Sequence, residues 1–100
     1  MSSDVTGSVR DVDARLLESA PKVTVTVEFV NHSDRAVAVD SFRLVWPPYE
    51  QVEKDAGIVV PANQSTTRVV HIATAHPPEP TTTRVEILVA RAPSFWERLR

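Results

Sequence analysis

A strict alternation of apolar and polar residues runs through Lys22–Val30. The apolar side chains share one face, at Val23, Val25, Val27 and Phe29. Because successive side chains of a β-strand point to opposite faces of a sheet, this period of two predicts a strand with one buried face and one solvent-facing face. The polar cluster Asn31–Arg35 consists of residue types that favour turns, and it ends the strand.

The apolar pattern of the next segment, Ala36–Trp46, changes phase near Asp40 and Ser41. Its apolar residues therefore fall on two faces, with Phe42, Leu44 and Trp46 on one and Val37 and Val39 on the other. Either a β-bulge returns both halves to the core, or the strand bends there and enters a second sheet. The pattern favours the bulge. Pro47 and Pro48 end the strand, because proline has no N–H for the sheet ladder.

The segments that follow are less uniform. Tyr49–Ala56 is polar and poorly periodic, so we expect a connection that crosses the end of the fold, with or without a short edge strand. The apolar run Gly57–Val60 predicts a strand, and a turn at Pro61–Ser65 leads into an alternating strand over Thr66–Thr74. The short turn between these two strands predicts that they pair as a hairpin.

Two further strands complete the predicted set. Thr82–Arg91 alternates regularly, and it follows a proline-rich stretch, His76–Pro80, that we expect to be a stiff connector. Ser8–Leu17 alternates less regularly and predicts the first strand. Six to seven strands in a chain of 100 residues predict an all-β fold, an antiparallel sandwich of two sheets.

The predicted strands divide the chain into a flexible N-terminus (1–7), a β-sandwich (8–92) and a C-terminal tail (93–100). A chain of this length can bury one core without covalent staples, and it contains no cysteine. The residues that we expect to face the core are Val25, Val27, Phe29, Phe42, Leu44, Trp46, Val70, Ile72, Val85 and Ile87.

Composition and charge narrow the possible partners. Val, Thr and Ile, which favour strands, make up 29 of the 100 residues. The net charge of −2 gives no basic excess, so we expect no nucleic-acid partner. No apolar run approaches the roughly 20 residues of a membrane span, and the first residues lack the pattern of a secretory signal. We therefore expect no membrane insertion and, if Met1 is the native start, a cytoplasmic protein.

Three strand-and-turn patterns extend the prediction of the fold. They are VTVTVEFVNHSDRAV, GIVVPANQSTTRVV and TRVEILVA. In these patterns the chain resembles bacterial immunoglobulin-like domains of the fibronectin type III or CARDB kind, which implies an immunoglobulin-like sandwich. The first half is also similar to the bacterial intracellular proteinase inhibitor, a cytosolic immunoglobulin-like protein. That second resemblance implies protease inhibition as an alternative function.

Residues that could support catalysis or metal binding are few and scattered. His32, His71 and His76 match no zinc motif, and no cysteine accompanies them. Asp11 and Asp13 share a strand face, but no neighbouring loop supplies the further oxygens that calcium requires. No serine lies in a G-x-S-x-G elbow, and two glycines are too few for a phosphate loop. We expect no enzyme activity, no catalytic residue, no cofactor and no metal.

The C-terminal tail concentrates large apolar residues in a charged segment. We identify Phe95, Trp96 and Leu99 as candidate contacts to a protein partner. Alternatively, Phe95 and Trp96 fold back over an open end of the sandwich. Ser94 and Glu97 have the spacing of a capping box, which favours a helical turn.

The sequence therefore predicts a non-catalytic protein-interaction module, whose partner is an unidentified protein held by an edge strand, by the loops at one end or by the tail. The alternative is a cytosolic protease inhibitor that presents a loop, over Trp46–Ala56, to an active-site cleft. A third and less favoured hypothesis is an enzyme or transport protein that uses the histidines. The sequence does not define the oligomeric state.

Overall fold

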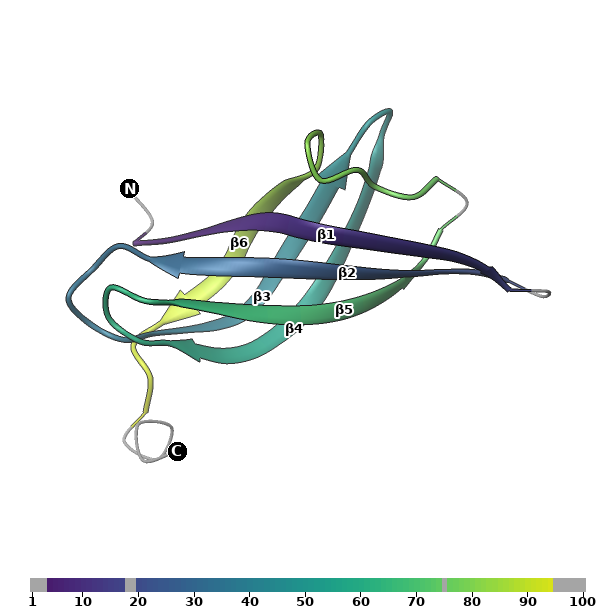
Figure 1. Cartoon of the computed structure of the whole chain (residues 1–100). Coiled ribbons are helices and arrows are strands. Elements are labelled where there is room, and N and C mark those ends of the chain that lie inside the picture. Colours follow the sequence, from purple (N-terminus) through teal and green to yellow (C-terminus); the bar gives the residue numbers. More distant parts are fainter. Residues whose placement is uncertain (1–3, 18–19, 75, 95–100) are drawn as a thin grey trace.

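The protein folds into six antiparallel β-strands in two three-stranded sheets (Figure 1). The computed structural model describes residues 4–17, 20–74 and 76–94, and these residues contain no helix. The strands are β1 (Val5–Leu17), β2 (Ala20–Asn31), β3 (Val37–Trp46), β4 (Glu50–Val60), β5 (Ser65–Ala73) and β6 (Arg84–Arg91). One sheet has the order β1-β2-β5 and the other has the order β4-β3-β6. The predicted all-β architecture of two antiparallel sheets is confirmed.

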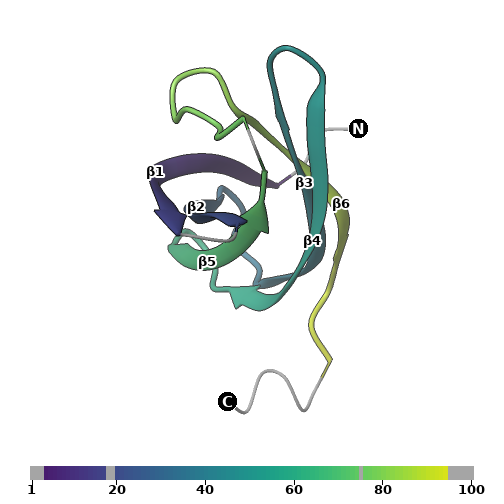
Figure 2. The same ribbon diagram turned by 90° about the vertical axis from the view of Figure 1, so that its right-hand side faces the viewer.

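The two sheets lie on either side of one hydrophobic core (Figure 2). Phe29 of β2 and Phe42 of β3 meet across it with their ring centroids 5.2 Å apart and their planes at 73°. This edge-to-face arrangement is favourable for aromatic rings. The residues that we expected to face the core are buried, except Val85 and Ile87, which are half-buried and pack against it.

A β-bulge at Asp40 accounts for the change of phase in β3. Against β6, Val39 pairs with Ala90 and Ser41 pairs with Val89, so Asp40 is an extra residue of β3. Against β4, Val39 pairs with Ile58 and Ser41 pairs with Asp55, so the extra residue of that pairing belongs to β4. Because a bulge inserts one extra residue, the apolar residues on both sides of it point into the core. Val39 and Phe42 are accordingly both fully buried. The predicted bulge is confirmed, and β3 stays within one sheet.

The segment Tyr49–Ala56 is not the connection that the sequence predicts. Strand β4 begins at Glu50, which pairs with Trp46, so that only Pro47–Tyr49 form the turn between β3 and β4. The expected connection was wrong, whereas the edge strand that the pattern allowed is present, because Glu50–Ala56 form the first part of the edge strand β4, which needs few apolar residues. Lys54 of β4 pairs with a buried residue of β3 and is half-buried. A charged residue in such an inward position discourages pairing with a further strand.

Strands β4 and β5 do not form the predicted hairpin, because they belong to different sheets. β5 pairs with β2 instead, with Val70 opposite Val25 and Ile72 opposite Val23. This pairing brings four buried side chains together on the core face. The connection 61–64 therefore crosses from one sheet to the other. A turn signal in the sequence locates two successive strands but does not specify the neighbour with which each one pairs.

Strand β1 begins at Val5, before the predicted start at Ser8, so the strand includes residues assigned above to a flexible N-terminus. A register shift between Val9 and Asp11 forms a second bulge. Val5 and Val9 before the bulge are buried, and Val12 after it packs against the core. Because the bulge shifts the alternation, the pattern around Val12 did not indicate that Val5 and Val9 are buried.

At Gly7, β1 comes close to β6 of the opposite sheet. A Cβ atom at this position would lie 2.5 Å from Cγ1 of Val85 in β6 and 3.4 Å from the ring of Phe29. No side chain fits there unless Val85 shifts. Gly7 thus allows the two sheets to close along the β1 and β6 edges.

Candidate protein-interaction site

The turn Pro47–Tyr49 and the connection 76–83 lie side by side at one end of the sandwich, which we call the Tyr49 end (Figure 2). Trp46 opposite Glu50 is the last pair of the β3-β4 hairpin before the turn. Two successive prolines fix their φ angles there and offer no N–H donors. Tyr49 follows them with 96% of its surface exposed, more than any other large hydrophobic residue that the structure describes.

Trp46 anchors the base of this turn. Its side chain is buried, and its Nε1 donates a hydrogen bond of 2.7 Å to the carbonyl oxygen of His76. The backbone N–H of His76 in turn donates to Oγ1 of Thr74, at 3.1 Å. The hairpin and the connection are therefore joined directly beneath the exposed Tyr49.

The connection is itself held by hydrogen bonds at its end near β6. Oγ1 of Thr83 donates to the carbonyl oxygen of Glu79 at 2.6 Å, and the backbone N–H groups of Thr82 and Thr83 donate to the same oxygen. Pro78 is buried, whereas Pro77 and Pro80 are exposed. These contacts hold the connection as a defined loop rather than as a freely moving one.

Two pockets that are open to solvent flank the turn. One, of about 390 Å³, lies between the turn and the start of β6 and is lined in part by Tyr49, Gln51 and Arg84. The other, of about 260 Å³, lies between Pro47 and the connection, with Pro77 and Glu79 among its walls. The Tyr49 end thus combines proline rings and one exposed aromatic ring with a charged rim, which suits contact with another protein.

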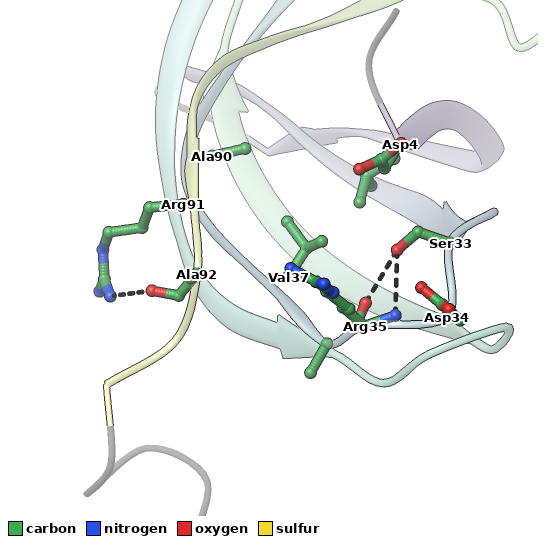
Figure 3. A pocket seen from close by; sticks show the side chains of 10 residues that line it. Asp4, Ser33, Asp34, Arg35, Val37, Ala90, Arg91 and Ala92 are labelled. Atoms are coloured by element: carbon green, nitrogen blue, oxygen red, sulfur yellow. Dashed lines mark hydrogen bonds between the residues drawn. The ribbon is translucent and has the colours of Figure 1, made fainter.

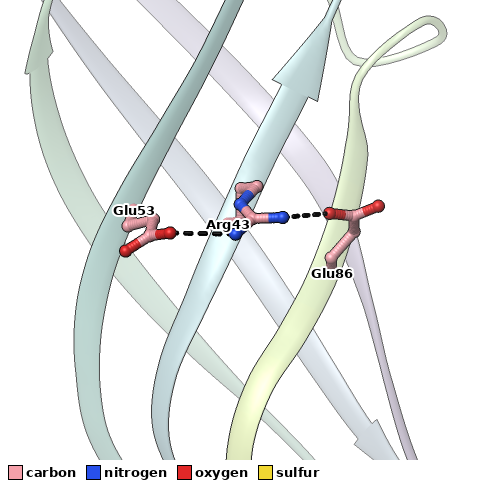
Figure 4. Close-up of polar contacts among 3 residues, drawn as sticks. All are labelled: Arg43, Glu53 and Glu86. Carbon is pink, nitrogen blue, oxygen red and sulfur yellow. Dashed lines mark hydrogen bonds and ion pairs between the residues drawn. The ribbon is translucent and has the colours of Figure 1, made fainter.

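The outer face of the β4-β3-β6 sheet carries an ion-pair network centred on Arg43 (Figure 4). Its Nη2 is 2.9 Å from Oε1 of Glu53 on β4, and its Nη1 is 3.2 Å from Oε1 of Glu86 on β6. The hydrogen bond that Arg43 donates to Glu53 is the main cause that raises the pKa of Arg43, the bond to Glu86 adds to it, and desolvation acts in the opposite direction. The guanidinium joins all three strands, so we assign it a structural role.

The histidines considered above do not converge. Nε2 of His32 is 2.9 Å from Oγ1 of Thr6, and Nδ1 of His71 is 3.2 Å from Oγ1 of Thr24. His76 contributes its carbonyl oxygen to Trp46. Across the described ranges, no group of three His, Cys, Asp or Glu residues has the arrangement of a metal site. Asp11 and Asp13 are exposed on β1.

The candidate partner contacts Phe95, Trp96 and Leu99 lie outside the described residues. Their role stays a prediction. Pro93 and Ser94, which precede them, are described, and Pro93 is buried.

Comparison with known proteins identifies no relative of this chain. No family model matches the chain, and no curated protein or solved structure is significantly similar to it. The part of the chain that the structure describes holds no helix with the length and apolar character needed to span a membrane.

The sequence analysis did not identify Tyr49 as a contact residue. Tyr49 follows two prolines, but the assignment of Tyr49–Ala56 to a long connection concealed its place at a hairpin tip. An aromatic residue directly after Pro-Pro and between two pairing strands is the signal that could have identified it.

Proposed function

We propose that this protein is a non-catalytic protein-interaction module on an immunoglobulin-like sandwich, and that the Tyr49 end contacts its protein partner. The observation that carries the proposal is the exposure of Tyr49, 96%, at the tip of a hairpin whose base is fixed. Tyrosine is enriched at protein interfaces and among the residues that contribute most to binding.

The anchored turn favours binding for a second reason. Association costs free energy when a loop or side chain must be ordered in the complex. At the Tyr49 end, the two prolines and the bond from Trp46 to His76 order the turn before binding. A partner that covers Tyr49 therefore orders little beyond that one side chain.

The sheet topology supports the immunoglobulin-like part of the proposal. Strands one, two and five form one sheet, and strands three, four and six form the other. Immunoglobulin-like domains place strands A, B and E opposite strands C and F, with C′ beside C in the variable type. The six strands fit that arrangement as A, B, C, C′, E and F in chain order. Such domains cluster their loops at the two ends of the sandwich.

Protease inhibition is retained as a second candidate because the same tip projects from the fold. The inhibitory loop that we expected over Trp46–Ala56 is shorter, since Glu50–Ala56 belong to β4. Only Pro47–Tyr49 remain as a turn that could enter a cleft. In this case Tyr49 would fill a specificity pocket of the protease.

Replacement of the exposed ring tests the proposal. Tyr49→Ser should leave the fold unchanged and abolish capture of the partner from an extract of the native cell. Val69→Ser is the matched control, because Val69 is 51% exposed on the other sheet. Proteins captured by the wild type and by Val69→Ser, but not by Tyr49→Ser, support the proposal. Equal capture by all three chains contradicts it.

Titration against purified proteases separates the two candidates. Stoichiometric inhibition that is lost in Tyr49→Ser and kept in Val69→Ser supports the inhibitor. Capture that depends on Tyr49, without inhibition of serine, cysteine or metalloproteases, supports the interaction module.

A further inference from the structure

Figure 3 shows a larger pocket, of about 630 Å³. Val37, the first residue of β3, lines it, so the pocket lies at the opposite end of β3 from Tyr49. Its walls come from the start of β1, the connection between β2 and β3, and the end of β6. Three alanines, Ala36, Ala90 and Ala92, are among its lining residues, together with Val5 and Val37. The small alanine side chains leave the space open, and the pocket is large enough to accept an aromatic side chain.

The charges at this pocket are unequal. Asp4 and Asp34 both line it, and neither carboxylate has an ion-pair partner among the residues that the structure describes. Arg35 offers one exposed guanidinium nearby. The other arginine, Arg91, points away from Asp4 and Ser33 (Figure 3) and binds Asp40 through two bonds of 2.7 and 3.1 Å. The pocket therefore retains an acidic excess.

The residues that follow Ser94 have the complementary chemistry. Phe95 and Trp96 are aromatic, and the arginines Arg98 and Arg100 outnumber the one acidic residue of the segment, Glu97. The chain enters this segment from the pocket itself, because Ala92 is a wall residue and Pro93 is buried. Trp96 lies four positions after Ala92, and an extended chain of that length spans up to about 14 Å. The aromatic side chains can thus reach the pocket from where they are tethered.

We propose that the C-terminal segment of the same chain occupies this pocket, with Phe95 or Trp96 between the alanines and with Arg98 and Arg100 against Asp4 and Asp34. Tethering favours this segment over an unattached peptide as the occupant, because a short linker raises the effective concentration of the segment at the pocket to about the millimolar range. Docking covers the apolar walls and neutralises the acidic excess. The proposal does not depend on the function proposed for the Tyr49 end, which lies at the other end of β3.

Fluorine NMR of the full chain tests this docking. Incorporation of 5-fluorotryptophan labels Trp46 and Trp96, and a Trp96→Phe variant assigns the two resonances. A soluble paramagnetic agent broadens the signals of exposed rings. We expect the Trp96 resonance to be protected in the dilute wild type. Ala90→Lys, which fills the pocket and repels the arginines, should increase its broadening several-fold.

Matched variants and dilution complete the test. Ala73→Lys, at an exposed alanine on β5 outside the pocket, should leave Trp96 protected. Replacing both carboxylates, Asp4→Asn with Asp34→Asn, should raise the broadening of Trp96. A Trp96 that is freely broadened in the wild type overturns the proposal, as does protection that Ala90→Lys does not change. Protection that disappears on dilution also overturns it, because the occupant would then be a second copy.

Discussion

The two ends of the sandwich are built from different chemistry. At the end that contains Asn31, which we call the Asn31 end, polar groups bond to one another and hold the sheets together. Asn31 is only 1% exposed, and its Nδ2 donates to the carbonyl oxygens of Arg35 and Val60, at 2.7 and 3.0 Å. Its Oδ1 accepts hydrogen bonds from the N–H and the hydroxyl of Ser33. At the Tyr49 end, by contrast, the most exposed of the aromatic side chains that the structure describes follows two prolines in a turn.

Backbone bonds strengthen this difference. His32 donates to the carbonyl oxygen of Asp4, Asn63 donates to that of Ser33, and Asn31 donates to that of Gln64, at 2.7 to 3.0 Å. These bonds join the start of β1 and the two connections that flank β3-β4. The Asn31 end therefore joins the two sheets through buried polar groups, whereas the Tyr49 end presents an exposed side chain on an anchored turn. The two roles can be separated by mutation.

The core between the two ends provides the reference for the stability changes expected at each end. Phe42→Ala should lower the free energy of unfolding by about 3 to 5 kcal/mol, because it empties a fully buried site opposite Phe29. Urea denaturation measures this change. A loss near zero would mean that Phe42 does not face the core and that the bulge at Asp40 is placed incorrectly.

Asn31→Ala should produce the next largest loss of unfolding free energy, about 3 kcal/mol, because four hydrogen bonds disappear and buried carbonyl oxygens lose their donor.

Asn31→Asp keeps the shape of the side chain but directs a carboxylate at the same two carbonyl oxygens. Burial and these oxygens should raise its pKa. Because the carboxyl group then binds its proton more tightly in the folded state than in the unfolded state, protonation favours folding. The unfolding free energy of Asn31→Asp should therefore approach that of the wild type as the pH falls. A pH-independent difference between the two would contradict this role for Asn31.

Trp46→Phe should have a smaller effect, about 1 kcal/mol, because it removes one hydrogen bond to His76 while most of the buried ring remains. Thermal denaturation should show a decrease of about 4 to 8 °C for a domain of this size. The variant should also increase amide hydrogen exchange in the 76–83 connection. Unchanged exchange there would mean that Trp46 does not fix the Tyr49 end.

Tyr49→Ser should have the smallest effect on stability, within about 0.5 kcal/mol, because the ring is almost completely exposed in the free protein. Asn31→Ala and Tyr49→Ser then separate the two roles, because the first should lower the stability of the fold and the second should remove binding of the partner. A large loss of stability in Tyr49→Ser would show that the ring packs on the fold and is not presented to a partner.

Sequence reasoning succeeded where local pattern determines structure. The alternation of Lys22–Val30 located β2, and the change of phase at Asp40 located a bulge. It failed for β4, whose edge position tolerates a polar sequence, and for the pairing of β5. Sheet membership depends on which partner buries a strand's apolar face, and adjacent strands in the sequence need not be partners. Tyr49 was missed for the same reason, because its position at a tip follows from the pairing of β4 with β3.

Photocrosslinking tests the central claim most directly. A photoreactive phenylalanine analogue at position 49 should crosslink the protein partner in the native cell, whereas the same analogue at position 69, on the exposed outer side of β5, should not. Because both positions are exposed in the folded chain, both variants should keep the fold. A crosslink from position 49 alone is the predicted result. A crosslink from position 69 without one from position 49 would show that the partner binds the other sheet and would contradict the assignment of the Tyr49 end.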